Sequence, residues 1–227
     1  MVEIWLPYGK SDVSVKVRDE DLLGIVQMNE RTGSVNPRAD IERAVRSPVG
    51  RKRLSEIAHS DDTVVIVLGM SEPKVAVSVL DSVLKELRLA AVKDSNVTVL
   101  VGSKVGQSTN REQIFSLVTE NYREVKTVLH DHLARDAVFL GETSSGIAVY
   151  VNKAFAESKV RLLVGEISVD CLTAYTGGPE TLLQGAAGIQ TVRQCYAKIV
   201  DSNSKVGVTE QNPVFEDMRR IAEVARV

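Results

Sequence analysis

The sequence contains little cysteine, few aromatic residues and no long apolar run. Its two cysteines, Cys171 and Cys195, have no paired spacing, so neither a disulfide framework nor a zinc knuckle is indicated. A reducing, cytoplasmic setting is therefore expected. No apolar run approaches the ~18 residues of a membrane span, and the N-terminus carries an acidic residue and a proline where a signal peptide would be apolar. We expect no membrane partner.

An excess of either charge is also absent. The 28 basic and 30 acidic residues give a formal net charge of -2, which provides no electrostatic case for nucleic acid as a partner. With 227 residues and a 44% hydrophobic composition, the chain can bury a substantial core. We expect a single domain over residues 1–227, in which residues 1–60 form a cover on the sheet.

The order of the apolar runs predicts an α/β fold. Residues 63–68 and 97–101 are continuous β-branched runs, typical of strands buried on both faces, and each precedes a glycine-containing loop and a helical pattern. Two successive units of this kind imply parallel strands. Residues 2–17 alternate around a turn and predict a hairpin. The expected architecture is a Rossmann-like open, mostly parallel sheet flanked by helices, with an N-terminal β-hairpin cover.

Three loops that follow predicted strands are the first candidates for a site. They cover residues 69–73, 102–108 and 168–180, and each places glycine beside polar side chains, where backbone amides can approach a phosphate or carboxylate. Pro179 follows a glycine pair and suits the first position of a helix. Glycines also follow strands merely to turn the chain, and no P-loop or complete dinucleotide fingerprint is present.

Other candidate residues have a structural interpretation beside the functional one. His130 and His132 flank an aspartate, and such a triplet either holds a metal or forms a solvated turn, which we favour. Cys171 is either a thiol nucleophile or a buried small apolar residue, and we favour burial. Ser108 or Thr109 is expected to cap the helix that follows the second loop.

Five segments carry a resemblance to a known family. They are residues 6–10 (Leu-Pro-Tyr-Gly-Lys), 140–153, 174–178 (Ala-Tyr-Thr-Gly-Gly), 185–189 (Gly-Ala-Ala-Gly-Ile) and 211–217 (Gln-Asn-Pro-Val-Phe-Glu-Asp). In one register over nearly the whole chain, they resemble the N-terminal domain of the lactate racemase family. The resemblance implies the α/β fold already predicted. Catalytic members of the family carry a second, C-terminal domain, so this sequence is either a short paralogue or a piece of a longer protein.

Family members that racemise lactate use a nickel-pincer nucleotide, two acid/base histidines, and an aspartate and an arginine near the substrate. At the aspartate and arginine positions, the resemblance places Gly69 and Glu72. At the positions of the two histidines, it places Lys104 and Asp170. A glutamate repels a substrate carboxylate that an arginine would clamp.

The two remaining family positions concern the cofactor. Glu180 falls where a lysine carries it covalently, and Tyr196 falls where a histidine ligates nickel. Glutamate has no amine for the covalent link, and tyrosine is a poor substitute for neutral imidazole as a nickel ligand. By resemblance and loop pattern, the expected cofactor- or anion-binding residues are Gly102, Ser103, Tyr175, Thr176, Gly177, Gly178 and Glu180.

These substitutions lead to three hypotheses. The first is a non-racemising module that binds a nucleotide or another small anionic ligand. The second is an enzyme with altered chemistry on a 2-hydroxy acid, in which Lys104 and Asp170 act as acid and base and the nickel-pincer nucleotide is held without a covalent bond. The third is a structural or partner-dependent subunit whose crevice is vestigial or is completed by another chain. That chain would be a second copy in a homo-oligomer or a separate chain that supplies the missing domain.

Overall fold

The computed structural model describes residues 1–25, 32–102 and 110–227. The chain divides into two compact units, Met1–Val35 and Asn36–Val227. Within the described residues, no helix has the length and apolar character needed to cross a membrane.

The first unit is built on an antiparallel hairpin, as predicted. Strand β1 (Val2–Tyr8) pairs with β2 (Ser11–Val17) in a register that runs from Val2 opposite Val17 to Tyr8 opposite Ser11. Gly9 occupies the turn with φ 64°, a left-handed conformation that glycine adopts without strain. A short 3₁₀ helix, η1 (Asp19–Asp21), follows.

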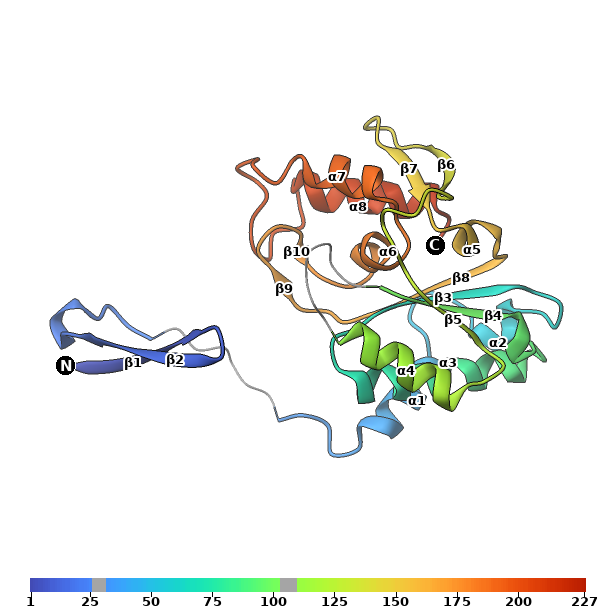
Figure 1. Ribbon diagram of the computed structural model, residues 1–227, viewed down its shortest axis with the longest axis horizontal. Helices are drawn as coiled ribbons and strands as arrows, with labels where there is room; N and C mark the ends of the chain where they lie inside the picture. The colour runs from blue at the N-terminus through green and yellow to red at the C-terminus, as the bar shows by residue number, and fades with distance from the viewer. Residues whose placement is uncertain (26–31, 103–109) are drawn as a thin grey trace. The chain divides into compact units, whose positions relative to one another are not determined.

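The second unit is organised around a parallel sheet of four strands. They are β3 (Val64–Gly69), β4 (Val97–Val101), β5 (Lys126–Leu129) and β8 (Val160–Gly165), in the order β5-β4-β3-β8. All three neighbouring pairs are parallel. The prediction of an α/β fold with a parallel sheet is confirmed. Its strands are continuous apolar runs because helices cover both faces of the sheet (Figure 1).

One side of the sheet is covered by the helices of the first half of the unit. They are α1 (Pro37–Arg46), α2 (Leu54–Ile57), α3 (Pro73–Leu89) and α4 (Arg111–Asn121), and the 3₁₀ helix η2 (Asp94–Asn96) leads into β4. Asn36 caps α1 by accepting the Ala39 N–H at 3.2 Å. The N-cap of α4 is Asn110, whereas Ser108 and Thr109, one of which was predicted to cap this helix, lie outside the described residues.

The other side is covered by later elements (Figure 1). They are the hairpin β6 (Val138–Glu142) and β7 (Ala148–Val151), the helices α5 (Lys153–Glu157), α6 (Pro179–Gly185), α7 (Ile189–Tyr196) and α8 (Pro213–Val224), and a small arm, β9 (Val169–Asp170) with β10 (Ala174–Tyr175). Helix α6 contacts β3 and β8 directly.

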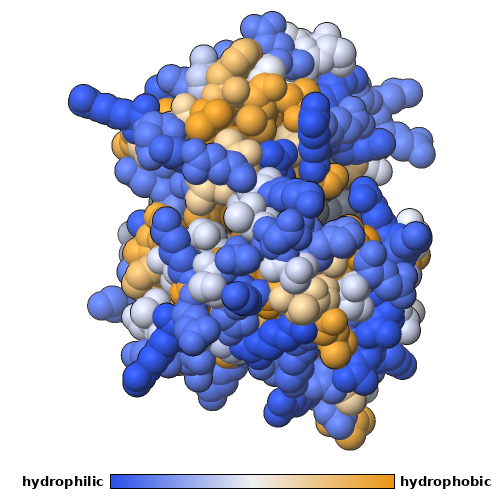
Figure 2. All heavy atoms as spheres, turned by 90° about the vertical axis from the view of Figure 1, so that its right-hand side faces the viewer, coloured by the Kyte–Doolittle hydropathy of each residue, from blue (hydrophilic) through white to orange (hydrophobic). Residues whose placement is uncertain are grey.

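Two apolar clusters meet at the sheet because its side chains alternate between the faces. Val65 and Val67 of β3 join the cluster under α6, α7 and α8, whereas Val64, Ile66 and Leu68 join the cluster with α3 and α4. All five side chains are fully buried. The outer surface is mostly hydrophilic in the view of Figure 2, with apolar side chains gathered in its upper part.

Candidate functional site

The carboxyl ends of three parallel strands meet at one edge of the sheet, as the strand order requires. In the register, Leu68 lies opposite both Val101 and Val164, and the loops that follow lie next to one another. The loop after β3 is tied to the loop after β8, because the Ser71 N–H donates to Glu166 Oε2 at 3.3 Å and the Ser71 hydroxyl donates to the same oxygen. Asn110, at the start of α4, donates to the Ser71 carbonyl at 3.0 Å.

Helix α6 packs against this edge without space for side chains between them. A Cβ at Gly102 would lie 2.2 Å from the Gly185 Cα, and one at Gly165 would lie 2.0 Å from Thr181 Oγ1. The Gly102 N–H donates to the Leu68 carbonyl at 3.1 Å. A Cβ added at Gly69, beneath the same helix, would lie 3.1 Å from the Thr181 side chain. The edge therefore needs glycine for close backbone packing.

At the start of α6, backbone amides form hydrogen bonds with groups of the same turn, including the Glu180 carboxylate. Gly177 and Gly178 have φ values of 79° and 50°, which favour glycine. The Gly177 N–H donates to Glu180 Oε2 at 3.3 Å, and the Glu180 and Thr181 N–H groups donate to the carbonyls of the glycine pair at 3.1 and 3.0 Å. Glu180 is 1% exposed. An anionic ligand at this turn would have to compete with that carboxylate.

The polar side chains of the β9–β10 arm are engaged within the arm. Thr176 Oγ1 accepts the Ser168 N–H at 2.7 Å and donates to the Glu166 carbonyl at 2.7 Å. Asp170 Oδ1 accepts the N–H groups of Leu172 and Thr173, each at 2.9 Å. These bonds fix the arm at the edge of a cavity.

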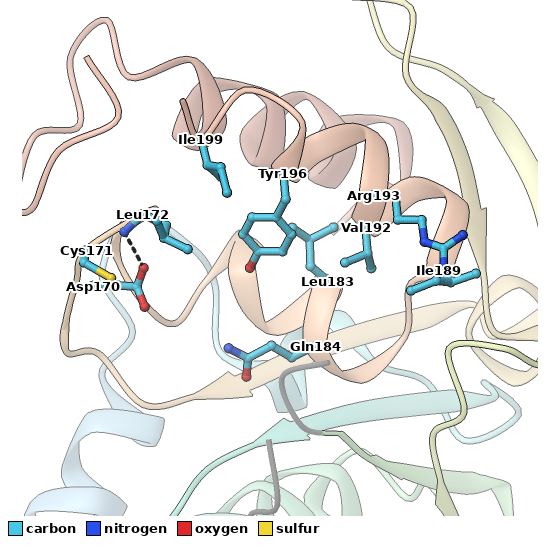
Figure 3. A pocket seen from close by; sticks show the side chains of 10 residues that line it. All are labelled: Asp170, Cys171, Leu172, Leu183, Gln184, Ile189, Val192, Arg193, Tyr196 and Ile199. Atoms are coloured by element: carbon cyan, nitrogen blue, oxygen red, sulfur yellow. Dashed lines mark hydrogen bonds between the residues drawn. The ribbon is translucent and has the colours of Figure 1, made fainter. Parts of the chain in front are cut away.

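A cavity of about 470 Å³ lies between this arm and the helices α6 and α7 (Figure 3). Its walls are mainly apolar, and its polar groups are a carboxylate, an amide, a guanidinium and a phenol. The lining residues are Asp170, Cys171, Leu172, Leu183, Gln184, Ile189, Val192, Arg193, Tyr196 and Ile199. Figure 3 shows Asp170 and Arg193 at opposite ends, with the Tyr196 ring between them.

The Tyr196 phenol stays protonated in this setting. Burial raises its pKa above the usual range, and the negative charges of Glu180 and Asp170 raise the pKa further. Tyr196 therefore presents an O–H group that can donate a hydrogen bond to a ligand. Asp170 and Tyr196, predicted from different segments, both line the cavity.

The remaining predicted residues that the structure describes are not among those that line the cavity. Glu72 is exposed and caps α3, because its carboxylate accepts the Lys74 N–H at 3.2 Å. Tyr175 is 38% exposed, and an added Cβ at Gly207 would lie 3.4 Å from its hydroxyl. Ser103 and Lys104 lie outside the described residues.

Apart from Tyr196, sequence reasoning missed the helical wall of the cavity. Ile189, Val192, Arg193 and Tyr196 follow one another at positions i, i+3, i+4 and i+7, which is one stripe of α7. The stripe looks like an ordinary core face, and Arg193 is the only signal in it that could have indicated a binding surface. No pattern in the sequence points to Gln184.

Two of the favoured interpretations are wrong. Cys171, in the short connection between β9 and β10, is exposed rather than buried. His130 does not lie in a solvated turn, since it is 3% exposed and its Nε2 donates to the Ala187 carbonyl at 2.9 Å. His132 Nδ1 lies 2.9 Å from the same oxygen. No group of three potential metal ligands occurs among the described residues.

The fold and the cavity define an α/β domain with a small-molecule-sized pocket beside the carboxyl ends of its parallel strands. The model of the lactate racemase N-terminal domain matches residues 8–207. The chain therefore belongs to that family, as the resemblance predicted.

Its relatives are longer proteins. The chain is 27% identical over 234 residues to a lactate racemase from Thermoanaerobacterium thermosaccharolyticum and 22% identical to one from Lactiplantibacillus plantarum. Each alignment covers 100% of this chain and 55% of the relative, so the chain spans about half the length of these curated relatives.

Solved structures agree in fold. The lactate racemase apoprotein from T. thermosaccharolyticum superposes with a TM-score of 0.74 at 25% identity, covering 100% of this chain and 54% of that one. A crystal structure of a Thermotoga maritima protein gives a TM-score of 0.57 at 15% identity, covering 83% of this chain and 46% of that one, and shows the fold alone.

Proposed function

We propose that this chain is a non-racemising ligand-binding domain on the lactate racemase scaffold, whose ligand occupies the cavity between the β9–β10 arm and α7. The observation that carries the proposal is the composition of that cavity. Apolar walls enclose about 470 Å³, and a few polar groups are placed at its ends, which is the usual make-up of a small-molecule site.

The nickel-pincer nucleotide of the family does not fit the residues present. The carboxylate of Glu180 offers no amine for a covalent bond, and it already accepts the Gly177 N–H. Tyr196 is a protonated phenol, whereas a nickel ligand at that position needs a free electron pair on a strong donor. Neither anchoring of the nucleotide nor ligation of its metal is supported by these two side chains.

The ligand class that matches the cavity is a nucleotide or a similar molecule with a flat ring and an anionic group. Leu183, Val192 and the Tyr196 ring offer an apolar surface for the ring. Arg193 is exposed at one end, where a guanidinium can hold a phosphate or carboxylate with two hydrogen bonds. Asp170 at the other end accepts hydrogen bonds, as ribose hydroxyls or ring N–H groups would require.

Calorimetric titration with adenosine monophosphate and with nicotinic acid mononucleotide tests the proposal. We expect binding of at least one probe, and Arg193→Gln should weaken it about tenfold, because a charged hydrogen-bond pair is lost. The matched control is Arg219→Gln, an exposed arginine on α8 outside the cavity. No binding of either probe, or equal effects of the two variants, contradicts the proposal.

The cluster of Asp170, Glu180 and Tyr196 supports a second candidate, an enzyme that moves protons on a 2-hydroxy acid. Asp170 and Tyr196 line the same cavity, the charge of Glu180 acts on the pKa of Tyr196, and groups that perturb one another in this way occur at catalytic sites. Lys104, the expected partner of Asp170, lies outside the described residues. Incubation with each lactate enantiomer followed by chiral chromatography decides this candidate: interconversion that Asp170→Asn abolishes favours the enzyme, and unchanged enantiomers exclude it.

A further inference from the structure

The N-terminal hairpin has one face made almost entirely of apolar side chains. Directly opposite residues of an antiparallel pair point to the same side, and side chains alternate along each strand. The register pairs on this side are Val2–Val17, Ile4–Val15, Leu6–Val13 and Tyr8–Ser11, which place seven apolar side chains together. This face, called the apolar face below, comprises Val2, Ile4, Leu6, Tyr8, Val13, Val15 and Val17, with Ser11 as its one polar member.

The opposite face of the same hairpin is largely polar. It carries Glu3, Asp12, Ser14 and Lys16, with Trp5 and Pro7 among them. The difference between the faces is the pattern of a sheet that is buried on one side and solvated on the other. A two-stranded hairpin is marginally stable on its own in water, so the apolar face requires a surface to cover it.

Several charged groups of the unit form ion pairs within it. The N-terminal ammonium binds Asp19 Oδ2 at 2.7 Å, and Arg18 binds Glu20 and Asp21, each at 2.8 Å. The apolar face is thus the part of the unit that the unit's own residues leave uncovered. A partner that covers it must offer apolar surface rather than charge.

The comparisons indicate what that occupant is. The family's N-terminal domain model begins its match at residue 8, so nearly all of β1 lies outside it. The curated lactate racemases nevertheless align with 100% of this chain, β1 included, and 45% of their length has no counterpart here. Helix α8 also lies outside the domain model, but its apolar side chains are buried in the core of the second unit.

We propose that the apolar face docks on a protein domain equivalent to that remaining part of the relatives. The hairpin is then a β-element that belongs to the interface between the two halves of the protein, and the partner presents a complementary apolar surface. This inference concerns protein contacts alone and stands whether or not the cavity binds a nucleotide.

The test uses the whole chain and a defined probe. The probe is the part of the T. thermosaccharolyticum lactate racemase that follows the matched region, produced as a separate chain and checked for a cooperative melt. Hydrogen exchange followed by mass spectrometry reports the protection of amides in residues 2–17, and light scattering reports the mass of the species. For the chain alone we expect a monomer with rapid exchange, and on adding the probe we expect a complex in which the hairpin amides are protected.

Variants on the two faces provide a matched comparison. The double variant Leu6→Ser/Val13→Ser should weaken the complex at least tenfold, because two contacting apolar side chains are lost. Trp5→Ser removes a larger apolar side chain from the opposite face and should change affinity less than about twofold. Tyr8→Ser, next to the turn, is a milder change that leaves the central pairs intact and should weaken binding about fivefold.

Three results would overturn the proposal. Protected hairpin amides in the monomeric chain alone would mean that the chain covers its own apolar face. A dimer that the double variant dissociates would make a second copy the occupant. A complex with the probe that is insensitive to the double variant, or no complex at roughly 100 µM, would show that this face does not bind such a domain.

Discussion

On the α3–α4 side of the central sheet, the buried side chains are nearly all apolar, whereas the α6–α8 side also encloses ionisable groups. The exceptions on the first side are carboxylates with direct ionic partners, such as Glu86, which Arg53 contacts at 2.6 Å. On the second side His130, Glu180 and Asp217 are each 3% exposed or less, and Asp217 also has ionic partners, Lys198 at 2.6 Å and Arg220 at 3.0 Å. Burying such groups costs free energy, and proteins retain them mainly where function requires them.

The cavity lies on the second side, together with these buried ionisable groups, so the same elements contribute to the stability of the fold and to the candidate site. Helix α6 illustrates it, because one face packs on the strand ends through Gly102 and Gly185 while Leu183 and Gln184 line the cavity. The α3–α4 side supports the sheet, and the α6–α8 side is shaped around an opening. Changes on the two sides should therefore have separable effects.

The largest effect is expected where α6 meets the sheet. Gly102→Ala puts a methyl group 2.2 Å from the Gly185 Cα, and backbone cannot move aside as a side chain does. We expect a loss of at least about 3 kcal/mol in the free energy of unfolding, measured by urea denaturation. Gly33→Ala, where an added Cβ has no neighbour within 4 Å, should leave stability unchanged. A stable, well-packed Gly102→Ala variant would show that the α6 contact is adjustable.

Acid should act through the α6–α8 side first. Burial lowers the pKa of His130 to about 4, with the nearby His132 acting in the same direction and Asp131 opposing it. The unfolded chain binds a proton near pH 6.5 and the folded chain only near pH 4, so stability falls as pH decreases through this window, by about 3 kcal/mol at most.

Urea denaturation at several pH values between 7 and 4.5 measures this dependence. His130→Gln removes the titrating group and should flatten the curve, whereas Arg219→Gln, which changes an exposed side chain on α8, should preserve it. An unchanged slope in His130→Gln would assign the effect to other groups.

A buried carboxylate on the α3–α4 side should affect stability alone. Burial raises the pKa of Glu86, but hydrogen bonds from Arg53 and Ser55 outweigh it, so the pKa lies below its usual range. Glu86→Gln weakens this charged pair and should cost about 2 kcal/mol while nucleotide affinity stays within about twofold. A parallel loss of affinity would mean that the two sides are coupled through the sheet.

The smallest effect separates the two thiols. Cys171 is exposed at the cavity, whereas Cys195 is fully buried, and burial raises its pKa to about 12. We expect a thiol reagent to label one cysteine in the folded protein and two after unfolding. A ligand that fills the cavity should slow the labelling of Cys171, and labelling of Cys195 in the native state would indicate local opening.

The sequence by itself determined the architecture of the sheet. Continuous β-branched runs and helical spacing act locally, so they located β3, β4, β8 and the hairpin close to their observed bounds. The resemblance to the lactate racemase N-terminal domain rested on motifs spread over the chain, and the family match bears it out. Parallel strand order then implied that three loops meet at one edge.

Only the tertiary structure decided what that edge can do. The close packing of Gly102 against Gly185 depends on a contact between segments far apart in the sequence, and the exposure of Cys171 depends on what packs around the arm rather than on a local pattern. The burial of His130 depends on the Ala187 carbonyl, which lies 57 residues away along the chain. Periodicity carries no information about such contacts, because it records which residues share a face and not what that face meets.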